Sequence, residues 1–334
     1  MKSLNREEFL SKLEQVSPGL ATREVVEQSA SFVFKDGWIY TYNDEVACRV
    51  QYEVGFEAAV HAQPLLELMR RLETKEVGLT LEKGELRVKS GSSRSGIRME
   101  AEIFLPIESV ELPEEWMDLD PDFLNAVETV QACASSNDTK FTLTCVHITP
   151  DFVEACDDFQ LTRYPLDTPV KEECLVRRDA LKHIIGLGVD EMGESDAWIH
   201  FRSASGLVVS CRKWSEDYPD LAELMVVTGT KTVLPGGLAE TIEKAEIFSV
   251  DNQEDDHIRV RLKKGQMRLK GEGAHGWYEE QKSVTYDGPA ITFLIAPKLL
   301  SQIVQQTNEC EVSESRLKFD AGKFQYIACL SLAD

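Results

Sequence analysis

Two distant stretches of this chain have nearly the same pattern, and this internal repeat constrains the fold more than any other feature. Residues 79–94 read LTLEKGELRVKSGSSR, and residues 260–274 read VRLKKGQMRLKGEGA. In both stretches apolar and polar residues alternate up to a Lys-Gly pair, after which the alternation resumes. Such alternation around a short turn that contains Gly is typical of a β-hairpin. The sequence therefore predicts the same hairpin in two places.

Amphipathic helices give the period of the repeat. Asn5 is expected to cap the first of them, with Glu8 three residues further on. Equivalent helices begin at intervals of roughly 115 residues, which indicates a repeat of the size of a domain. The first helix of each repeat is predicted over 5–16, 121–130 and 235–247, and the second helix over 61–72, 177–185 and 296–304.

Strand and turn signals follow each of these helices. Asp-Gly, Lys-Gly and Ser-Gly pairs lie between runs of alternating β-branched and aromatic residues. Two helices with one apolar face each can cover one face of an antiparallel sheet, so an α+β fold is expected for each repeat. Proline and acidic residues mark the junctions, and the predicted domains are 1–119, 120–229 and 230–334. Exposed sheet edges would pair between domains and with a second copy of the chain.

Composition limits the class of protein. The net charge of −22 argues against a chain coated with nucleic acid, although a local basic surface stays open. The first residues lack the apolar stretch of a signal peptide, and no apolar run is long enough to span a membrane. The eight cysteines show no CxxC pair, so reduced thiols in a cytoplasmic protein are expected.

The order and spacing of several segments resemble the bacterial-type DNA sliding clamp, the beta subunit of DNA polymerase III. The segments are LRVKSGSSRSGIRMEAEIFLP (86–106), EDYPDLAELM (216–225), AEIFSVDNQEDDHIRVRLKKGQMRLKG (245–271) and FQYIACLSL (324–332). The resemblance implies a DNA-clamp fold in which two protomers close head to tail into a ring of six domains. The ring would encircle duplex DNA without sequence preference and tether the replicative polymerase and the clamp loader. It implies neither catalysis nor a cofactor. The chain is somewhat short for a cellular clamp, which leaves a phage or divergent version open.

Basic residues on the predicted helices are the candidates for DNA contact, because Lys and Arg bind phosphates without reading sequence. The second helices are net positive in a strongly negative chain, and we expect the acidic residues on the outer sheets. Charged residues on solvated helix faces are the alternative explanation. The candidates are Lys12, Arg23, Arg70, Arg71, Lys75, Arg177, Arg178, Lys182, Lys244 and Lys298.

The resemblance also implies a dimer interface between the first domain of one protomer and the third domain of the other. The matching apolar positions are Val110, Ile247 and Phe248. Ile247 continues the apolar stripe of its helix, so it would equally suit an ordinary core. Phe248 lies off that stripe and is the better candidate for the interface.

Family clamps share an outer pocket that receives a short, partly apolar peptide of the polymerase or the loader. Here the usual Gly-His-Arg-Leu stretch is Asp158-Phe159-Gln160-Leu161, so an apolar floor is kept and the polar rim is changed. We therefore expect a different peptide preference, unless these residues only close the seam between two domains. The pocket candidates are Cys156, Asp158, Phe159, Gln160, Leu161, Pro219, Leu224, Ile327, Cys329 and Leu330, with Lys298 at the rim.

Other kinds of site have weaker support. Metal is not expected, because no cysteine pair has zinc-ligand spacing. Asp157-Asp158 and the acidic run at 254–256 are considered as paired catalytic carboxylates, but both fall in predicted turns, where Asp is favoured for local hydrogen bonds. The main alternative function is a clamp-fold adaptor that binds proteins without encircling DNA. The residues considered for zinc are Cys145, Cys156, Cys174, Cys211, His147, His183 and His200.

Overall fold

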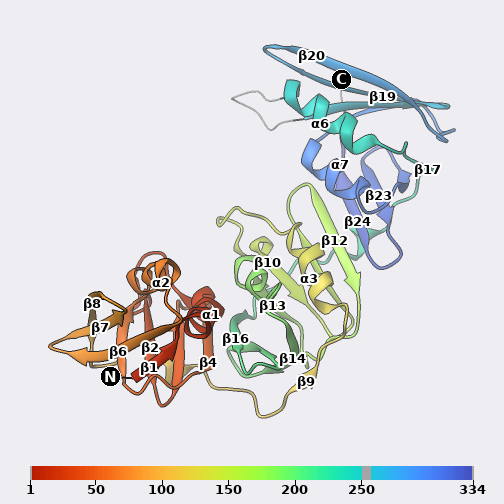
Figure 1. Ribbon diagram of the computed structural model, residues 1–334. Coiled ribbons are helices and arrows are strands. Elements are labelled where there is room, and N and C mark those ends of the chain that lie inside the picture. The colour runs from red at the N-terminus through yellow and green to blue at the C-terminus, as the bar shows by residue number, and fades with distance from the viewer. Residues whose placement is uncertain (1, 250–256, 333–334) are drawn as a thin grey trace. The chain divides into compact units, whose positions relative to one another are not determined.

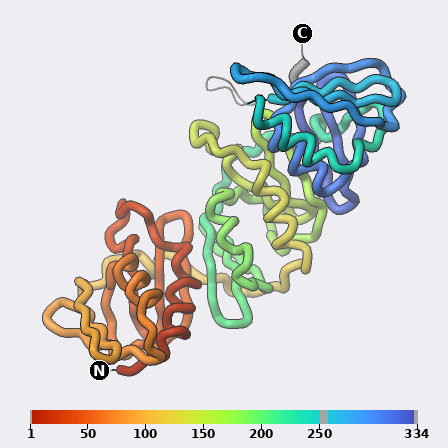
Figure 2. The backbone as a smooth tube through the Cα atoms, turned by 45° about the horizontal axis from the view of Figure 1, so that its top comes forward, coloured from red at the N-terminus to blue at the C-terminus, as the bar shows by residue number. Residues whose placement is uncertain are grey.

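The computed structural model describes residues 2–249 and 257–332 (Figures 1 and 2), and the chain divides into two compact units. The first unit comprises Met1–Glu128, Ile148–Pro150 and Asp167–Glu216, and the second comprises Thr129–His147, Asp151–Leu166 and Asp217–Asp334. Each unit combines antiparallel strands with a few helices, as expected for an α+β protein. The division into three domains stays a prediction.

The first unit is built on antiparallel strands that pair in an unbroken series. In pairing order the strands are β1 (Lys2–Asn5), β6 (Glu76–Glu82), β7 (Glu85–Ser90), β8 (Ser93–Glu100), β5 (Ala58–His61), β2 (Ser31–Lys35), β3 (Trp38–Tyr42), β4 (Val46–Gln51), β16 (Val208–Trp214), β15 (Trp198–Ser203), β14 (Val189–Glu194) and β9 (Met117–Asp118). A further strand, β13 (Cys174–Arg177), also pairs with β16.

The helices of the first unit are α1 (Arg6–Val16), α2 (Ala62–Arg71) and α4 (Arg178–Leu181), with short 3-10 turns at Ser17–Gly19, Ile107–Ser109 and Lys182–Ile184. The predicted cap of α1 is confirmed, because the Asn5 side chain accepts a hydrogen bond from the Glu8 amide at 3.0 Å. Phe9, Leu13 and Val16 are fully buried, so the apolar stripe read from the sequence is the face that packs on the strands.

The helix predicted over 177–185 is shorter than expected. Its α-helical part is only Arg178–Leu181, followed by the 3-10 turn Lys182–Ile184. Gly186 follows at a φ of 82°, a conformation that ends a helix and that side chains other than glycine rarely adopt. The helix predicted over 121–130 is α3 (Phe123–Gln131), and its residues are divided between the two units.

The second unit contains two sets of paired strands. One set is β11 (Phe152–Cys156), β12 (Gln160–Pro165), β24 (Gln325–Cys329), β23 (Arg316–Asp320), β22 (Glu309–Val312) and β17 (Thr230–Val233). The other is a five-stranded sheet in the order β20 (Gly276–Ser283), β19 (Gln266–Gly273), β18 (Ile258–Lys263), β21 (Ile291–Ile295) and β25 (Ser331–Leu332). The remaining elements are β10 (Cys145–Ile148), at the boundary between the units, the 3-10 turn Phe141–Thr144, α5 (Ala222–Met225), α6 (Leu238–Ser249) and α7 (Pro297–Val304).

The two matching hairpins of the sequence are confirmed. In β6–β7, Glu82 pairs with Glu85 across Lys83-Gly84, and in β18–β19, Lys263 pairs with Gln266 across Lys264-Gly265. The two-residue turns thus lie where the Lys-Gly pairs predicted them.

Helix α6 covers one face of the five-stranded sheet (Figures 1 and 2). Leu238, Ile242 and Ala245 of the helix are buried. A Cβ at Gly271 of β19 would collide with the carbonyl group of Ala245, so this strand position requires glycine for the close approach of helix and sheet. The opposite face of β18 and β19 is therefore free of this helix.

Within the described residues, no helix is both long enough and apolar enough to cross a membrane.

Candidate functional site

Helices α1 and α2 pack side by side and bring several of the predicted DNA-contact residues together. Lys12 lies on α1, Arg70 and Arg71 lie in the last turn of α2, and Lys75 follows α2 on the surface. The guanidinium of Arg70 is 2.9 Å from the Glu14 carboxylate, so part of its charge is already compensated. A second ion pair, at 3.4 Å, joins Arg71 to Glu67 of the same helix.

Three of the other basic candidates of the first unit lie in or next to the short helix α4. The guanidinium of Arg177 lies 3.7 Å from the Glu45 carboxylate, and the Lys182 ammonium lies 2.9 Å from the Asp179 carboxylate. The hydrogen bond from Lys182 lowers the pKa of the Asp179 carboxyl. The remaining two candidates of this unit are Arg178, which starts α4, and the exposed Arg23, in the loop before β2.

The second unit supplies only two of the predicted contacts. Lys244 is exposed on α6 and Lys298 is exposed on α7, and these two helices contact each other. Helix α6 also carries Glu240, Glu243 and Glu246, so its surface is net acidic. Helix α6 therefore offers phosphate a weaker attraction than α2 does.

The expectation that acidic residues gather on the sheets is wrong for the five-stranded sheet. The residues that point away from α6 on β18 and β19 include five basic side chains. We call this surface the basic face; it consists of Arg259, Arg261, Lys263, Arg268 and Lys270. Strand alternation explains the separation, because the apolar residues between them are buried on the side of α6.

The two predicted interface residues of α6, Ile247 and Phe248, have the opposite burial from that expected. Ile247 does not continue the buried stripe, since its side chain is 72% exposed. Phe248 is half-buried, and its ring stacks on Tyr278 of β20 with the ring centres 6.5 Å apart. Ile247 is thus the apolar side chain that α6 leaves uncovered, while Phe248 helps to hold β20 against the helix.

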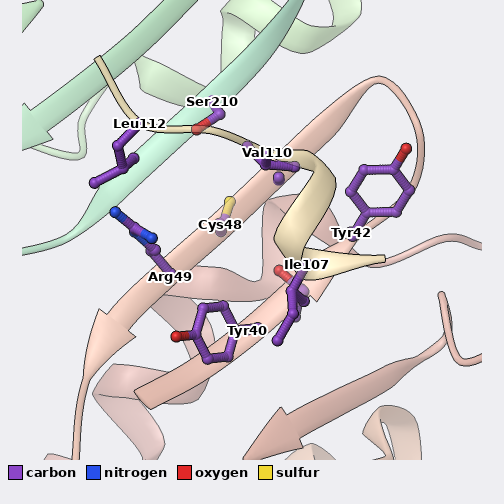
Figure 3. Close-up of a pocket in the computed structure, with 10 residues that line it drawn as sticks. Tyr40, Tyr42, Cys48, Arg49, Ile107, Val110, Leu112 and Ser210 are labelled. Atoms are coloured by element: carbon purple, nitrogen blue, oxygen red, sulfur yellow. The ribbon is translucent and has the colours of Figure 1, made fainter. Parts of the chain in front are cut away.

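Val110, the interface candidate of the first unit, is partly covered by its own unit. It packs against a buried cluster that includes Val33, Tyr42 and Trp198. It also lines a small pocket between strands β3 and β4 and the segment that follows Ile107 (Figure 3). Phe104, six residues earlier, is about half exposed and was not singled out by the sequence pattern.

Three of the predicted pocket residues meet in one apolar cluster of the second unit. Cys156 of β11 pairs with Leu161 of β12, and Leu161 pairs with Ile327 of β24. Their side chains are buried together with Leu221 and Met225. Burial raises the pKa of the Cys156 thiol, which therefore stays protonated and acts as an apolar group.

Pro219 and Leu224, predicted for the apolar floor, are not buried in this cluster, because both side chains are exposed. The segment 222–225 forms the helical turn α5, which directs Leu221 and Met225 inward and Leu224 outward. The spacing of Leu221 and Met225, four residues apart, was the sequence signal for this arrangement. Of the last two predicted residues, Leu330 is buried and Cys329 is exposed.

The turn at 157–160 determines which residues of the stretch 158–161 reach the rim of the predicted pocket. The Asp157 carboxylate accepts hydrogen bonds from the amides of Phe159, at 2.7 Å, and Gln160, at 2.8 Å. The Gln160 side chain is buried, donating to Asp157 and accepting from the Tyr326 hydroxyl. Asp158 is ion-paired with Lys140, and Phe159 is 47% exposed. Only Asp158 and Phe159 of this stretch are thus available at the surface.

Tyr218 packs against the cluster and is not among the residues predicted for the pocket. Its hydroxyl accepts a hydrogen bond from the Cys156 amide at 3.0 Å, and its ring lies 4.8 Å from the His147 ring. The buried Glu154 carboxylate contacts His147 Nδ1 at 2.9 Å and Arg163 at 2.7 Å. This polar network fixes the segment that lies over the apolar cluster.

The residues considered for zinc are dispersed. Among residues 2–249 and 257–332, no group of three or more His, Cys, Asp or Glu side chains is placed to hold a metal ion. Cys145, Cys174 and Cys211 are buried, and burial raises the pKa of Cys174 to about 12. The acidic run at 254–256 lies outside the described residues.

Comparison with solved structures identifies the fold, whereas comparison of sequences does not. No protein-family sequence profile matches the chain, and no curated protein matches its sequence. Solved structures do match. The DnaN sliding clamp (DNA polymerase III subunit beta) from Pseudomonas aeruginosa bound to griselimycin is 16% identical, with a TM-score of 0.85. The DNA polymerase III beta chain from Streptococcus pneumoniae is 14% identical, with a TM-score of 0.87.

A third solved structure, the DNA polymerase III beta subunit from Thermotoga maritima, is 19% identical with a TM-score of 0.84. Each of the three matches covers 99% of this chain and 99% of the solved chain. The likeness therefore includes the whole succession of helices and strands, and not only one unit. This chain has the fold of the bacterial DNA polymerase III beta sliding clamps.

Proposed function

We propose that this protein is a processivity factor that encircles duplex DNA as a closed ring of two copies and tethers a replicative polymerase. The observation that carries the proposal is the likeness to solved sliding clamps over 99% of both chains. In this function the protein works in the cytoplasm and catalyses no reaction itself. A clamp loader would place the ring on DNA. Processivity then arises from topology, so tight binding to DNA is not needed.

The placement of the basic candidates supports loose contact with DNA. Arg70, Arg71 and Lys182 are exposed, but each is paired with a carboxylate on its own surface. Phosphates would compete with these carboxylates, and the resulting affinity would be low and sensitive to salt. A ring that must slide along DNA is suited to such contacts.

Ring closure is supported by two strand edges that have room for a partner. Over Ser93–Arg98, strand β8 pairs with β7 on one side, and its pairing with β5 involves only Met99 and Glu100. Strand β20 ends the five-stranded sheet. We propose that β8 of one copy pairs with β20 of the other, because uncovered edges are templates for pairing. Ile247, exposed on the helix that packs against β20, would be buried beside this seam.

The apolar cluster around Leu161 and Ile327 supports a site for a partner peptide. Phe159, two residues before Leu161, and Leu224, directly before Met225, are exposed apolar side chains, and they are suited to hold a Leu or Phe anchor. Because Gln160 is turned inward, the rim offers Asp158 and Phe159 as its changed contacts. The preferred peptide would be that of the cognate polymerase.

Solution mass is the first test of the proposal. Light scattering is expected to give twice 37.6 kDa at micromolar concentration. The second test uses a nicked circular duplex on which the ring has been assembled by concentrating the protein in its presence. A closed ring should stay on the circle at high salt and leave it when a restriction enzyme linearises the DNA. A monomer, or a protein that leaves circular and linear DNA equally, would favour the adaptor instead.

A further inference from the structure

The basic face brings like charges together in a way that sheet stability alone does not favour. In the β18–β19 ladder Arg259 is directly opposite Lys270, and Arg261 is directly opposite Arg268. Like charges at directly opposite positions destabilise an antiparallel pair. The net charge of the whole chain is −22, so five bases on one face of a sheet are more than the composition of the protein leads us to expect. An anionic ligand would relieve the repulsion.

The three bases of β18 are the most available of the group. Arg259, Arg261 and Lys263 are exposed, and none has a carboxylate partner in the part of the chain that the structure describes. On β19, by contrast, Arg268 lies 3.5 Å from Glu279, and Lys270 lies 2.7 Å from Glu272. Alternate residues of one strand face the same side, so the three bases of β18 form a row of about 13 Å.

An exposed tryptophan borders the same surface. Trp277 of β20 pairs with Glu272 of β19, so its side chain shares the face with Arg268 and Lys270. The indole is 62% exposed, and the Lys270 ammonium lies 5.8 Å from the centre of its ring. A large aromatic ring held at the surface beside bases is a platform on which a nucleobase can stack.

We propose that the basic face, together with Trp277, binds single-stranded nucleic acid. The phosphates contact the row of Arg259, Arg261 and Lys263, and one base stacks on Trp277. This site lies on the side of the sheet away from α6, so it differs from the helix surfaces assigned to duplex DNA. A stretch of acidic protein would satisfy the bases but would gain nothing specific from the exposed indole, and for this reason nucleic acid is the better occupant.

The experiment measures the fluorescence anisotropy of a labelled oligothymidylate titrated with the full chain at low salt. Replacing Arg259, Arg261 and Lys263 together with Ala should weaken binding about tenfold or more and reduce the slope of log K against log salt by about 2. Trp277→Ala should weaken binding about fivefold or more through lost stacking. The matched control replaces Arg87, Lys89 and Lys171, three exposed bases of the first unit, and should leave binding unchanged.

Arg261→Glu separates a binding defect from a folding defect. It places a carboxylate directly opposite Arg268, so the melting temperature should rise or stay constant while oligothymidylate binding falls. Unchanged affinity in the Ala triple variant would overturn the proposal. A second outcome would also overturn it. In that outcome the Ala triple variant loses affinity for oligothymidylate, Trp277→Ala keeps it, and polyglutamate displaces the oligonucleotide fully. This combination would indicate an acidic protein partner. Neither result affects the ring, whose own test is retention on circular duplex.

Discussion

The hydroxyl group of Tyr218 accepts a hydrogen bond from the backbone amide of Cys156 at 3.0 Å. This bond ties the segment before α5 to strand β11 and places the aromatic ring against His147. Burial raises the pKa of the Tyr218 hydroxyl, which therefore stays protonated throughout the physiological range. The position of the segment over the apolar cluster thus depends on a contact between residues far apart in the sequence.

Tyr218→Phe should lower the free energy of unfolding by about 1–2 kcal/mol, because the Cys156 amide loses its acceptor in a partly buried place. Denaturant titration measures the change. Tyr40→Phe is the control, since the Tyr40 hydroxyl has no hydrogen-bond partner among the described residues. Equal stabilities of the two variants would contradict a structural role for the Tyr218 hydroxyl.

Leu161→Ala and Leu224→Ala should differ strongly in stability. Leu161 is 5% exposed within the apolar cluster, so its truncation leaves a cavity and should cost about 2–4 kcal/mol. Leu224 points outward from α5, and its truncation should cost less than about 1 kcal/mol. A clamp-binding peptide of the cognate polymerase should nevertheless bind Leu224→Ala more weakly than wild type. Full peptide affinity in that variant would remove Leu224 from the proposed site.

Ile247→Asp should convert the proposed dimer to monomer with little loss of fold stability, because this side chain is exposed on its own helix. A buried carboxylate at the seam would carry a desolvation cost that the lost apolar contact cannot offset. Sedimentation at low micromolar concentration measures the mass. Lys244→Asp introduces the same group on an exposed position of α6 and should remain dimeric. A dimeric Ile247→Asp protein would place the seam elsewhere.

Replacing Arg70, Arg71 and Lys182 together with Ala should weaken binding to duplex DNA and flatten its salt dependence. Their ion pairs are exposed, so the melting temperature should change little. Electrophoretic shifts at several salt concentrations measure the effect. The variant without Arg87, Lys89 and Lys171 carries the same change in net charge, and equal loss in both variants would show that only net charge matters.

His200 should make the protein sensitive to acid. Burial, together with the charges of Arg49 and Lys213, lowers the pKa of His200 to about 3, against 6.5 for an unperturbed group. The folded state therefore keeps the imidazole neutral, whereas the unfolded chain takes up a proton below about pH 6.5. The stability that the neutral His200 contributes is complete above pH 6.5 and is lost as the pH falls towards 3. The free energy of unfolding should fall by about 2 kcal/mol between about pH 7 and pH 5 through this group.

His200→Gln keeps a side chain that can bond to Ser195 and Ser210, the two partners of the imidazole, but it cannot gain a proton. The difference between wild type and variant should therefore change with pH over this interval. Chemical denaturation at a series of pH values measures it. Parallel curves for the two proteins would show that His200 is not the group that titrates.

The local elements of this protein followed from its sequence. The cap at Asn5, the buried stripe of α1 and the Lys-Gly hairpins depend on residues close together in the chain, whose side chains repeat at 3.6 or at 2 positions. The resemblance of ordered segments to sliding clamps also led to the correct fold, because order and spacing persist at identities of 14–19%.

The tertiary structure alone decided which side chains reach the surface at the candidate sites. Ile247 continues an apolar stripe in the sequence, yet α6 leaves it exposed, while Phe248 finds Tyr278 on a strand thirty residues away. Gln160 reads as a polar rim residue, but the Asp157 turn and the Tyr326 hydroxyl hold it inside. The basic face forms only when β18 and β19 align in register and α6 covers their other side. In each case the deciding neighbour is distant in the chain, and periodicity carries no information about such a neighbour.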